Sequence, residues 1–265
     1  MSDRTLVTIE ARTGSSRLPA KVLADLHGRP MLERLIERVS KASVVNGIVL
    51  ATTTAPEDDV LEALAARLGI GCHRGSVEDV LGRVLGAAQA FGAEHLVALT
   101  GDNPLVDPEL INDVVAFYRQ GRFDYVTTTH MHHSRKWQAE RTFPVGVSVQ
   151  TFSARVLAEA SANTTDPVDR EHVSFYIYNH PERYRLGAFA AEGKYAAWRK
   201  PELRLTVDTP EDLALMRAIF GVLYPRNASF STGEAIRLVD GDPALKGMNA
   251  HVRQRIASEQ KAAHA

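Results

Sequence analysis

Residues 6–21 read Leu6-Val7-Thr8-Ile9-Glu10-Ala11-Arg12-Thr13-Gly14-Ser15-Ser16-Arg17-Leu18-Pro19-Ala20-Lys21. The first four are apolar or β-branched, which predicts a short buried strand. The strand leads directly into a loop that carries a glycine, two serines and three cations. Small residues let backbone N–H groups approach an anion, and Arg12 and Arg17 can each bind two phosphate oxygens. The stretch therefore indicates a polyphosphate site.

A simpler interpretation of this loop is a solvated turn, because surface cations are common and Gly-Ser loops often only reverse the chain. The presence of Arg12, Arg17 and Lys21 on one loop favours the phosphate site. The loop has neither the G-x-x-x-x-G-K-[ST] spacing of a P-loop nor the G-x-G-x-x-G spacing of a dinucleotide fold. We therefore expect a less common mode of phosphate binding.

The composition is that of an ordinary globular chain. Its 265 residues are 45% hydrophobic and 24% charged, enough for one large domain or a domain with a modest appendage. A formal net charge of −1 gives no general attraction to nucleic acid or to an anionic membrane, so neither is an expected partner. The single cysteine, Cys72, excludes an intramolecular disulfide and is typical of an inert core residue. No apolar run reaches about 18 residues and no signal peptide is recognisable, so we expect a cytoplasmic location.

Strand and helix patterns alternate through the first half of the chain. Expected strands cover 6–9, 48–52, 69–74 and 95–100, and expected helices begin at Pro30, Pro56, Val77 and Pro108. Thr54 is the expected cap of the second of these helices. The alternation predicts an α/β fold with a doubly wound, mostly parallel sheet.

The second half has a different pattern. Expected strands cover 123–129, 143–152, 184–190 and 203–207, and expected helices begin at 153, near 169 and after Thr209. Residues 130–137 predict a long loop. We expect one domain over 1–225, with an inserted subregion at 130–200, and an accessory helical tail over 226–265.

Two acids directly follow predicted strands. In such a sheet, ligands bind at the carboxyl ends of the strands, where the strand order reverses. One Mg²⁺ ion between Asp102 and Asp208 accounts for both acids, since Mg²⁺ takes one or two carboxylates together with substrate phosphates. Helix capping or turn formation is the alternative, and it is the favoured one for Asp208 taken alone.

The motif A-R-x-G-S-x-R-L-P-x-K at 11–21 resembles the signature of sugar nucleotidyltransferases of the cytidylyltransferase type, the group of the CMP-sialic acid and CMP-Kdo synthetases. Further blocks at 28–32, 51–53, 74–81, 100–107 and 205–212 follow the order of that family. The spore-coat and surface-polysaccharide subgroup is the closer match. The resemblance implies a Rossmann-type sheet of the nucleotide-diphospho-sugar transferase kind.

The resemblance also implies roles for residues on the loops. Cations and small residues would hold the nucleotide, and the two acids would hold a divalent metal. These roles fall to Arg12, Arg17 and Lys21 as catalytic cations on the triphosphate, to Ala11, Gly14 and Ser15 in nucleotide binding, to Arg74 and Ser76 at the base, and to Asp102 and Asp208 as ligands of Mg²⁺ or Mn²⁺.

The reaction so implied is attack of a sugar hydroxyl on the α-phosphorus of CTP, with release of pyrophosphate. The acceptor would be a 2-keto-3-deoxy sugar acid, sialic- or Kdo-like, for surface polysaccharide synthesis. A phosphonate or other anionic acceptor is one alternative, and a non-catalytic nucleotide-binding relative is another. A glycosyltransferase is disfavoured because no Asp-x-Asp triplet lies in a central loop. Relatives commonly form homodimers through the inserted subregion, so a homodimer is expected.

The segment 141–150 departs from the family pattern. Relatives tend to carry Asp at the positions of Val145 and Ser148 and Glu near Gln150. Either the acceptor pocket is retuned for a more anionic substrate, or those acids were never central to activation. Arg141 and His172 are the expected acceptor-binding residues, although His172 fits an ordinary helix histidine equally well.

The histidines of the long loop are a candidate zinc cluster. His130, His132 and His133 match no standard spacing and have no partner thiol, so a loop with titratable side chains is preferred. Trp137 in the same loop could close over a sugar.

Overall fold

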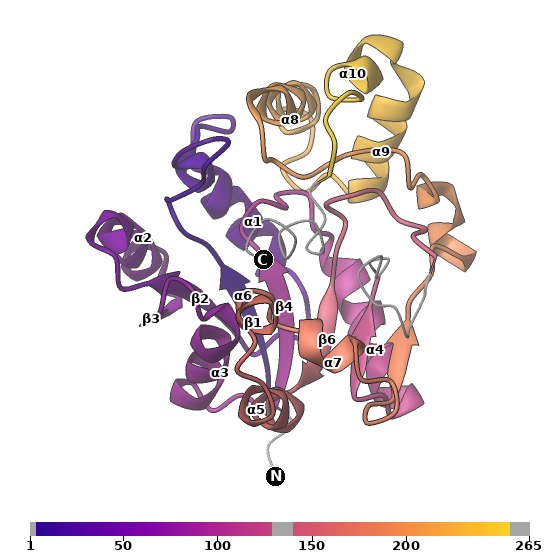
Figure 1. Cartoon of the computed structure of the whole chain (residues 1–265). Helices are drawn as coiled ribbons and strands as arrows, with labels where there is room; N and C mark the ends of the chain where they lie inside the picture. Colours follow the sequence, from indigo (N-terminus) through magenta and orange to yellow (C-terminus); the bar gives the residue numbers. More distant parts are fainter. Residues whose placement is uncertain (1–3, 129–139, 255–265) are drawn as a thin grey trace.

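The computed structural model describes residues 4–128 and 140–254. Within them, seven strands form one sheet in the order β3-β2-β1-β4-β6-β5-β7, with helices on both faces (Figure 1). The predicted α/β fold with a doubly wound, mostly parallel sheet is confirmed. The strands are β1 (Thr5–Glu10), β2 (Gly47–Thr53), β3 (Gly71–Gly75), β4 (His95–Thr100), β5 (Tyr125–Thr127), β6 (Gln150–Ser153) and β7 (Leu186–Ala188).

The strand order reverses between β1 and β4. The chain runs outward from β1 to β2 and β3, then returns to place β4 on the other side of β1, in parallel pairs throughout. Glu10 pairs with Thr100 at the carboxyl end of this central pair. β6 runs antiparallel to both neighbours, and β5 and β7 are parallel. The crevice that binds ligands in such folds therefore opens beyond Glu10 and Thr100.

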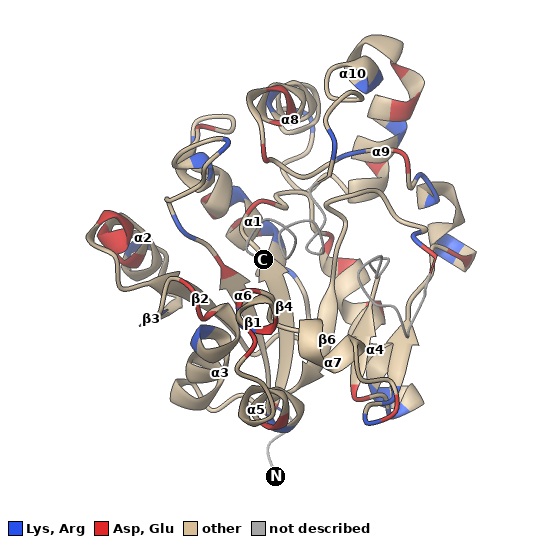
Figure 2. Cartoon of the chain, viewed as in Figure 1, with Lys and Arg blue, Asp and Glu red and all other residues tan. Residues whose placement is uncertain are grey.

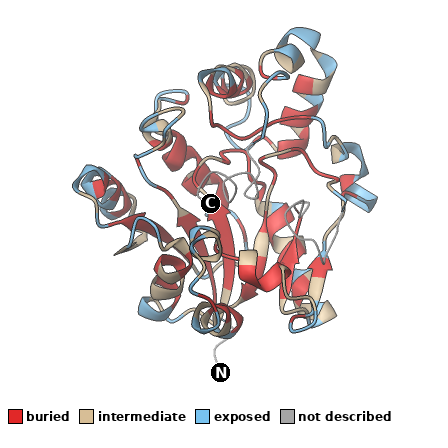
Figure 3. Ribbon diagram, in the orientation of Figure 1, coloured by how far each residue is buried: buried red, intermediate tan, exposed pale blue. Residues whose placement is uncertain are grey.

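Helices bury both faces of the sheet, and the central strands are coloured as buried in Figure 3. Alternate residues of β1 point to opposite sides, so Val7 and Ile9 join one hydrophobic cluster and Leu6 joins the other. The first cluster contains residues of α1 (Met31–Val39), α2 (Asp59–Leu68), α4 (Pro108–Gly121), α8 (Pro210–Leu223) and α9 (Thr232–Gly241). The second contains residues of α3 (Val80–Ala90), α5 (Ala154–Ala162) and α7 (Phe175–Tyr178). The remaining short helices are η1 (Lys21–Leu23), η2 (Pro56–Asp58), α6 (Pro167–Glu171), η3 (Gly193–Trp198) and α10 (Pro243–Gly247).

One of the two expected helix caps agrees with the sequence, the cap of α8, and the other differs, the cap of the helix after β2. Thr209 and Asp212 form a reciprocal capping box on α8, as the threonine predicts. Thr54 does not cap the second helix, which was a wrong prediction. The chain makes the 3₁₀ turn η2 first, and the Thr54 N–H instead bonds to the Gly75 carbonyl, continuing the pairing of β2 with β3.

Two predicted strands are largely absent. Of residues 143–152, only the end lies in β6, and residues 203–207 contribute only an isolated bridge, Val145 to Arg204. The cause is Gly146, whose φ of +93° interrupts an extended ladder. A Cβ atom there would lie 2.5 Å from the Thr206 backbone nitrogen, so glycine is required for this close approach.

The described part of the C-terminal region packs on the main core. Phe230, Ile236 and Val239 belong to the same hydrophobic cluster as α1 and α4. Arg38 of α1 donates to the carbonyls of Val106 and Phe230. The proposed division at residue 225, like that of the 130–200 subregion, stays a prediction.

Charges of both signs are distributed over the helices (Figure 2), in keeping with the net charge of −1. Within 4–128 and 140–254, no helix is long and apolar enough to cross a membrane. The predicted loop with His130, His132, His133 and Trp137 lies outside the described residues.

Candidate active site

Two cavities open at the carboxyl ends of β1 and β4. The first, of about 520 Å³, is lined by the loop after β1 together with residues of α3, α6 and α7. The second, of about 350 Å³, is lined mainly by residues 141–148. The two share one border, formed by Arg17, Thr100, Asp102, His172, Asp208 and Gln254. Two ligands, one in each cavity, would thus come into contact beside Asp102 and Asp208.

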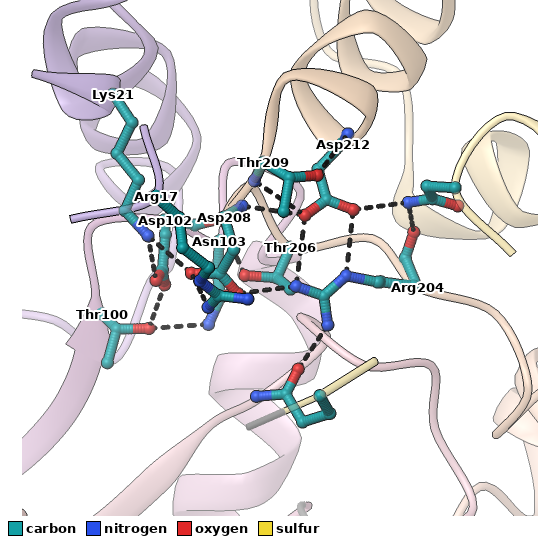
Figure 4. Close-up of polar contacts among 12 residues, drawn as sticks. Arg17, Lys21, Thr100, Asp102, Asn103, Arg204, Thr206, Asp208, Thr209 and Asp212 are labelled. Atoms are coloured by element: carbon teal, nitrogen blue, oxygen red, sulfur yellow. Dashed lines mark hydrogen bonds and ion pairs between the residues drawn. The ribbon is translucent and has the colours of Figure 1, made fainter. Parts of the chain in front are cut away.

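The acids at this border converge on a lysine. Lys21 Nζ lies 2.8 Å from Asp102 Oδ2 and 2.8 Å from Asp208 Oδ1 (Figure 4). Arg17 Nη2 lies 3.0 Å from the same oxygen of Asp208. The structure therefore brings together two cations of the loop and the two acids that the sequence singled out.

The pKa values of this cluster reflect the mutual pairing. Burial disfavours the charged form of Lys21, but Asp102 and Asp208 outweigh it and raise the pKa of the ammonium. Burial likewise disfavours ionised Asp208, yet Lys21, Arg17 and Arg204 hold the pKa of that carboxyl below its ordinary value. Both groups are consequently charged at neutral pH.

Asp208 is held from behind by an arginine that the sequence reasoning missed. Arg204 Nη2 lies 2.6 Å from Asp208 Oδ2, and Arg204 Nε lies 2.9 Å from Asp212 Oδ1. Asn249 donates to Asp212 at 2.7 Å, and Gln254 accepts from Arg204. The spacing of Arg204, Asp208 and Asp212, four residues apart each time, was the available signal. This network fixes one carboxylate oxygen of Asp208 and leaves the other facing Lys21.

The loop after β1 is anchored by a buried acid. Asp58 accepts from the Thr13 N–H at 2.7 Å and from the Thr13 hydroxyl at 2.8 Å. The Thr53 hydroxyl donates to its other oxygen. Asp58 has no signal in the sequence beyond its place next to the predicted helix start at Pro56, because its partner Thr13 is 45 residues away.

Replacing Asp58 with Ala is expected to lower the free energy of unfolding by about 2–4 kcal/mol, since three buried donors lose their acceptor. Loosening the loop should also weaken binding of CTP. Asp59→Ala is the matched control, because the Asp59 side chain is 67% exposed. Urea unfolding and calorimetric CTP titration measure the two effects. If Asp58→Ala and Asp59→Ala had the same free energy of unfolding and the same affinity for CTP, Asp58 would not anchor the loop.

Arg74 and Ser76 lie away from both cavities. The Arg74 guanidinium pairs with Asp59 at 2.7 Å and Glu62 at 2.8 Å, on α2. The Ser76 hydroxyl accepts from the backbone N–H of two following residues. Their expected contact with the base stays a prediction, and Glu10 and Arg83 line the first cavity where Arg74 and Ser76 do not. The other predicted residues of the loop, Ala11, Arg12, Gly14 and Ser15, line that same cavity.

Arg141 and His172 both line the second cavity. No hydrogen bond or ion pair joins the Arg141 guanidinium to any other residue that the structure describes. Burial, with repulsion from Arg204, lowers the pKa of Arg141. His172 borders both cavities, and its ring packs against Phe175 with centroids 5.9 Å apart.

The three positions where relatives tend to carry acids divide into two groups. Val145 and Ser148 line the second cavity. Gln150 does not: its side chain accepts from the Tyr125 hydroxyl at 2.9 Å and from the Ser174 hydroxyl. Only the first two positions therefore bear on what the cavity can hold.

A family model described as cytidylyltransferase matches residues 6–236. The chain belongs to the cytidylyltransferase family. It is accordingly a CTP-dependent nucleotidyltransferase, and the resemblance of its motifs to that family is confirmed.

The similarity of this cytidylyltransferase to its relatives extends over nearly the whole length of those proteins. The spore coat polysaccharide biosynthesis protein SpsF of Bacillus subtilis is 34% identical over 244 residues, covering 90% of this chain and 95% of that protein. A 3-deoxy-manno-octulosonate cytidylyltransferase of Anaeromyxobacter dehalogenans is 29% identical over 239 residues, covering 80% and 96%. The structure of a cytidylyltransferase from Leptospira borgpetersenii superposes with a TM-score of 0.79 at 25% identity, covering 96% and 98%.

The donor set of this cytidylyltransferase fits a divalent metal. Asp102 and Asp208 each place an oxygen 2.8 Å from Lys21 Nζ, so both carboxylates converge on one cation-sized point. Among the described residues no group of three or more His, Cys, Asp or Glu side chains is arranged for a metal. An Mg²⁺ ion on the two carboxylates would therefore complete its shell with phosphate oxygens and water.

Proposed function

We propose that this cytidylyltransferase transfers CMP from CTP to a small acidic sugar, of the 2-keto-3-deoxy type, and releases pyrophosphate for surface polysaccharide synthesis. One observation carries the choice of acceptor. Arg141 lines the second cavity with its guanidinium engaged by no other described residue. A half-buried arginine that no described acid neutralises calls for an anionic ligand, and the two oxygens of a carboxylate match its two parallel N–H donors.

The lining of the two cavities supports a particular placement of the two substrates, with CTP in the first and the acceptor in the second. The loop cations lie in the first cavity, which suits the triphosphate, and Arg141 lies in the second. The α-phosphate and the acceptor hydroxyl would then meet beside Asp102 and Asp208. Binding both partners in line across one border converts their encounter into a step within the complex.

Charge neutralisation would fall to the chain's own cations and to the metal. Arg17 and Lys21 pair with acids in the free protein and can turn to the phosphates when the nucleotide enters. They would offset the charge that grows on the departing pyrophosphate. Mg²⁺ held by Asp102 and Asp208 would supply further neutralisation of phosphate oxygens.

The transfer forms one bond, breaks one bond and releases one proton, so it needs one proton acceptor. The acceptor oxygen forms a bond to the α-phosphorus, and the bond from that phosphorus to the pyrophosphate oxygen breaks. The hydroxyl proton must leave, and we assign its removal to His172, which borders both cavities. Asp102 and Asp208 are less suited, since each is engaged by a cation.

A phosphonate is the second candidate acceptor. Val145 and Ser148 present no charge to the second cavity, and Arg141 and Arg17 present two positive charges. Asp102 and Asp208 also line it, but each pairs with Lys21, so a compact anion beside Arg141 meets no unpaired acid of this lining. The proposal also includes a homodimer and a cytoplasmic location, which rest on the family resemblance.

A pyrophosphate-release screen tests the acceptor class. CTP and Mg²⁺ are incubated with sugar acids, with phosphonates and with neutral sugars of matched size. Release is expected with an anionic acceptor and not with its neutral analogue. Equal release with the neutral analogue, or none with any anionic acceptor, would contradict the proposal.

CTP with Mg²⁺ is expected to raise the melting temperature by about 5 °C at a hundredfold excess over Kd, because ligand binding stabilises the folded state by about 2.7 kcal/mol there. GTP should raise it much less. Differential scanning fluorimetry measures both shifts. Equal shifts with all four nucleotides would show that the cavity does not select a base.

A further inference from the structure

Glu10 is a polar side chain of the first cavity for which the reaction above gives no role. It ends β1 and lies opposite Thr100 in β4. Alternation along the strand places it on the same face as Leu6, the face covered by α3. Its carboxyl group forms no hydrogen bond or ion pair with any residue in 4–128 or 140–254. The Glu10 side chain is only partly exposed and lines the open first cavity, so its carboxyl group is available to a ligand there.

A phosphate is a poor ligand for Glu10 itself. Arg17 and Lys21, which pair with the acids at the border shared by the two cavities, supply phosphate-binding charge there. A triphosphate placed against Glu10 would meet a like charge or a carboxylic acid with a single donor. The uncharged part of a nucleotide is the better match.

The neighbours of Glu10 suit a flat ring. Val80 of α3 and Tyr178 of α7 line the same cavity and offer apolar surfaces. Arg83 lies beside Glu10 but is already engaged, because its guanidinium donates to the carbonyls of Ala51 and Ser76. The carboxyl group of Glu10 thus lies in the same cavity as the apolar surfaces of Val80 and Tyr178, where a planar heterocycle with its own donors and acceptors can fit.

We propose that Glu10 contacts the nucleobase, with its carboxyl group against the edge of cytosine that carries N3 and the N4 amino group. This assignment rests on the proposed function, because it takes CTP as the nucleotide. It makes Glu10 a specificity-determining residue, in the role that Arg74 and Ser76 were expected to fill.

The protonation state of Glu10 agrees with this contact. Burial raises the pKa of Glu10 to about 8, with Arg83 opposing the rise and Asp102 adding to it. At neutral pH the acid would donate its O–H to cytosine N3 and accept an N–H from the N4 amino group. An ionised carboxylate would instead face the N3 lone pair. The titratable and charged groups around this part of the cavity are Arg12, Arg83, Asp102, Glu171, His172 and Tyr178.

Calorimetric titration of the full chain with CTP and with inorganic tripolyphosphate, each with Mg²⁺, tests the contact. Tripolyphosphate carries the charge of CTP and no base. Glu10→Ala is expected to weaken CTP binding roughly 10- to 100-fold and to change tripolyphosphate binding by less than about threefold. Glu10→Gln, whose amide presents the same donor and acceptor, should recover most of the lost CTP affinity.

A pH series adds a second readout. The CTP affinity of the wild type should fall as pH rises through about 8, because the raised pKa of Glu10 keeps its neutral form only below that pH. The affinity of Glu10→Gln should not show this fall. Glu202→Ala, at an acid whose side chain is 52% exposed, is the control and should match the wild type at each pH.

The outcomes separate this assignment from the proposed function. If the wild type binds CTP no more tightly than tripolyphosphate, the proposed function itself fails. If the wild type prefers CTP and Glu10→Ala keeps the full preference, only the role of Glu10 is wrong. Equal losses for CTP and tripolyphosphate in Glu10→Ala would also overturn it, since they would indicate a damaged phosphate loop.

Discussion

Asp208→Asn is expected to lower the rate of CTP-dependent pyrophosphate release about 1000-fold, as removal of one preorganised electrostatic group commonly does. Asp208 is the acid that meets Lys21, Arg17 and Arg204 at once. Asparagine keeps the size and one acceptor oxygen for Arg204 but removes the charge that a divalent metal needs. Pyrophosphate release at saturating CTP and acceptor measures the effect.

The control for Asp208→Asn is Asp240→Asn, which makes the same chemical change. Asp240 also pairs with two cations, Lys200 and Lys246, but its side chain is 27% exposed and lies in α9, away from both cavities. Its rate should equal that of the wild type. A rate of Asp208→Asn within tenfold of the control would exclude Asp208 from the metal and phosphate site.

Acid titration gives a further difference between Asp208→Asn and the wild type. The folded-state pKa of Asp208 lies below its ordinary value of 3.8, so its pairing stabilises the fold above that pH. That stability is lost as pH falls through the lower, folded-state pKa. The wild type should therefore lose stability below pH 4 more steeply than Asp208→Asn.

Arg141→Gln is expected to raise KM for the anionic acceptor about 100-fold, because a charge-assisted pair in a partly desolvated site is lost. KM for CTP should stay within about twofold, since Arg141 lines only the second cavity. Initial-rate kinetics with each substrate varied in turn measure both constants.

Two variants sharpen the test of Arg141. Arg141→Lys keeps the positive charge but loses the paired N–H donors of the guanidinium. Its KM for the acceptor should therefore be intermediate between those of the wild type and Arg141→Gln. Arg199→Gln is the matched control, because the Arg199 side chain is 44% exposed and its ion pairs with residues of the described ranges are 3.9 Å or longer. An unchanged acceptor KM in Arg141→Gln would contradict the proposed acceptor class.

The meeting of Lys21 with Asp102 could be predicted from the order of the elements. Each follows a predicted strand that the structure confirms, β1 and β4, and parallel strands end at one edge of the sheet. Asp208 is 187 residues from Lys21, and the strand predicted before it makes only an isolated bridge, so strand order does not place it. The alternation of patterns was sufficient for β1, β2 and β4, because strands buried on both faces have a strong apolar signal.

The wrong or incomplete predictions share a physical cause. Arg74 belongs to a family block, but its direction depends on Asp59 and Glu62, exposed acids of a neighbouring helix. Glu10 went unnoticed because a single acid after a strand is indistinguishable from a surface charge until α3 covers it. Such details depend on which side chains meet across elements, and a one-dimensional pattern does not contain them.

Gln254 makes the occupancy of the two cavities readable from a distant part of the sequence. It borders both cavities and accepts a hydrogen bond from Arg204, the same arginine that holds Asp208. A substrate in either cavity would therefore cover Gln254 and restrain its backbone. Hydrogen exchange at the backbone amide of Gln254 should slow when CTP or the acceptor binds, so this residue can serve as a reporter of binding that needs no turnover.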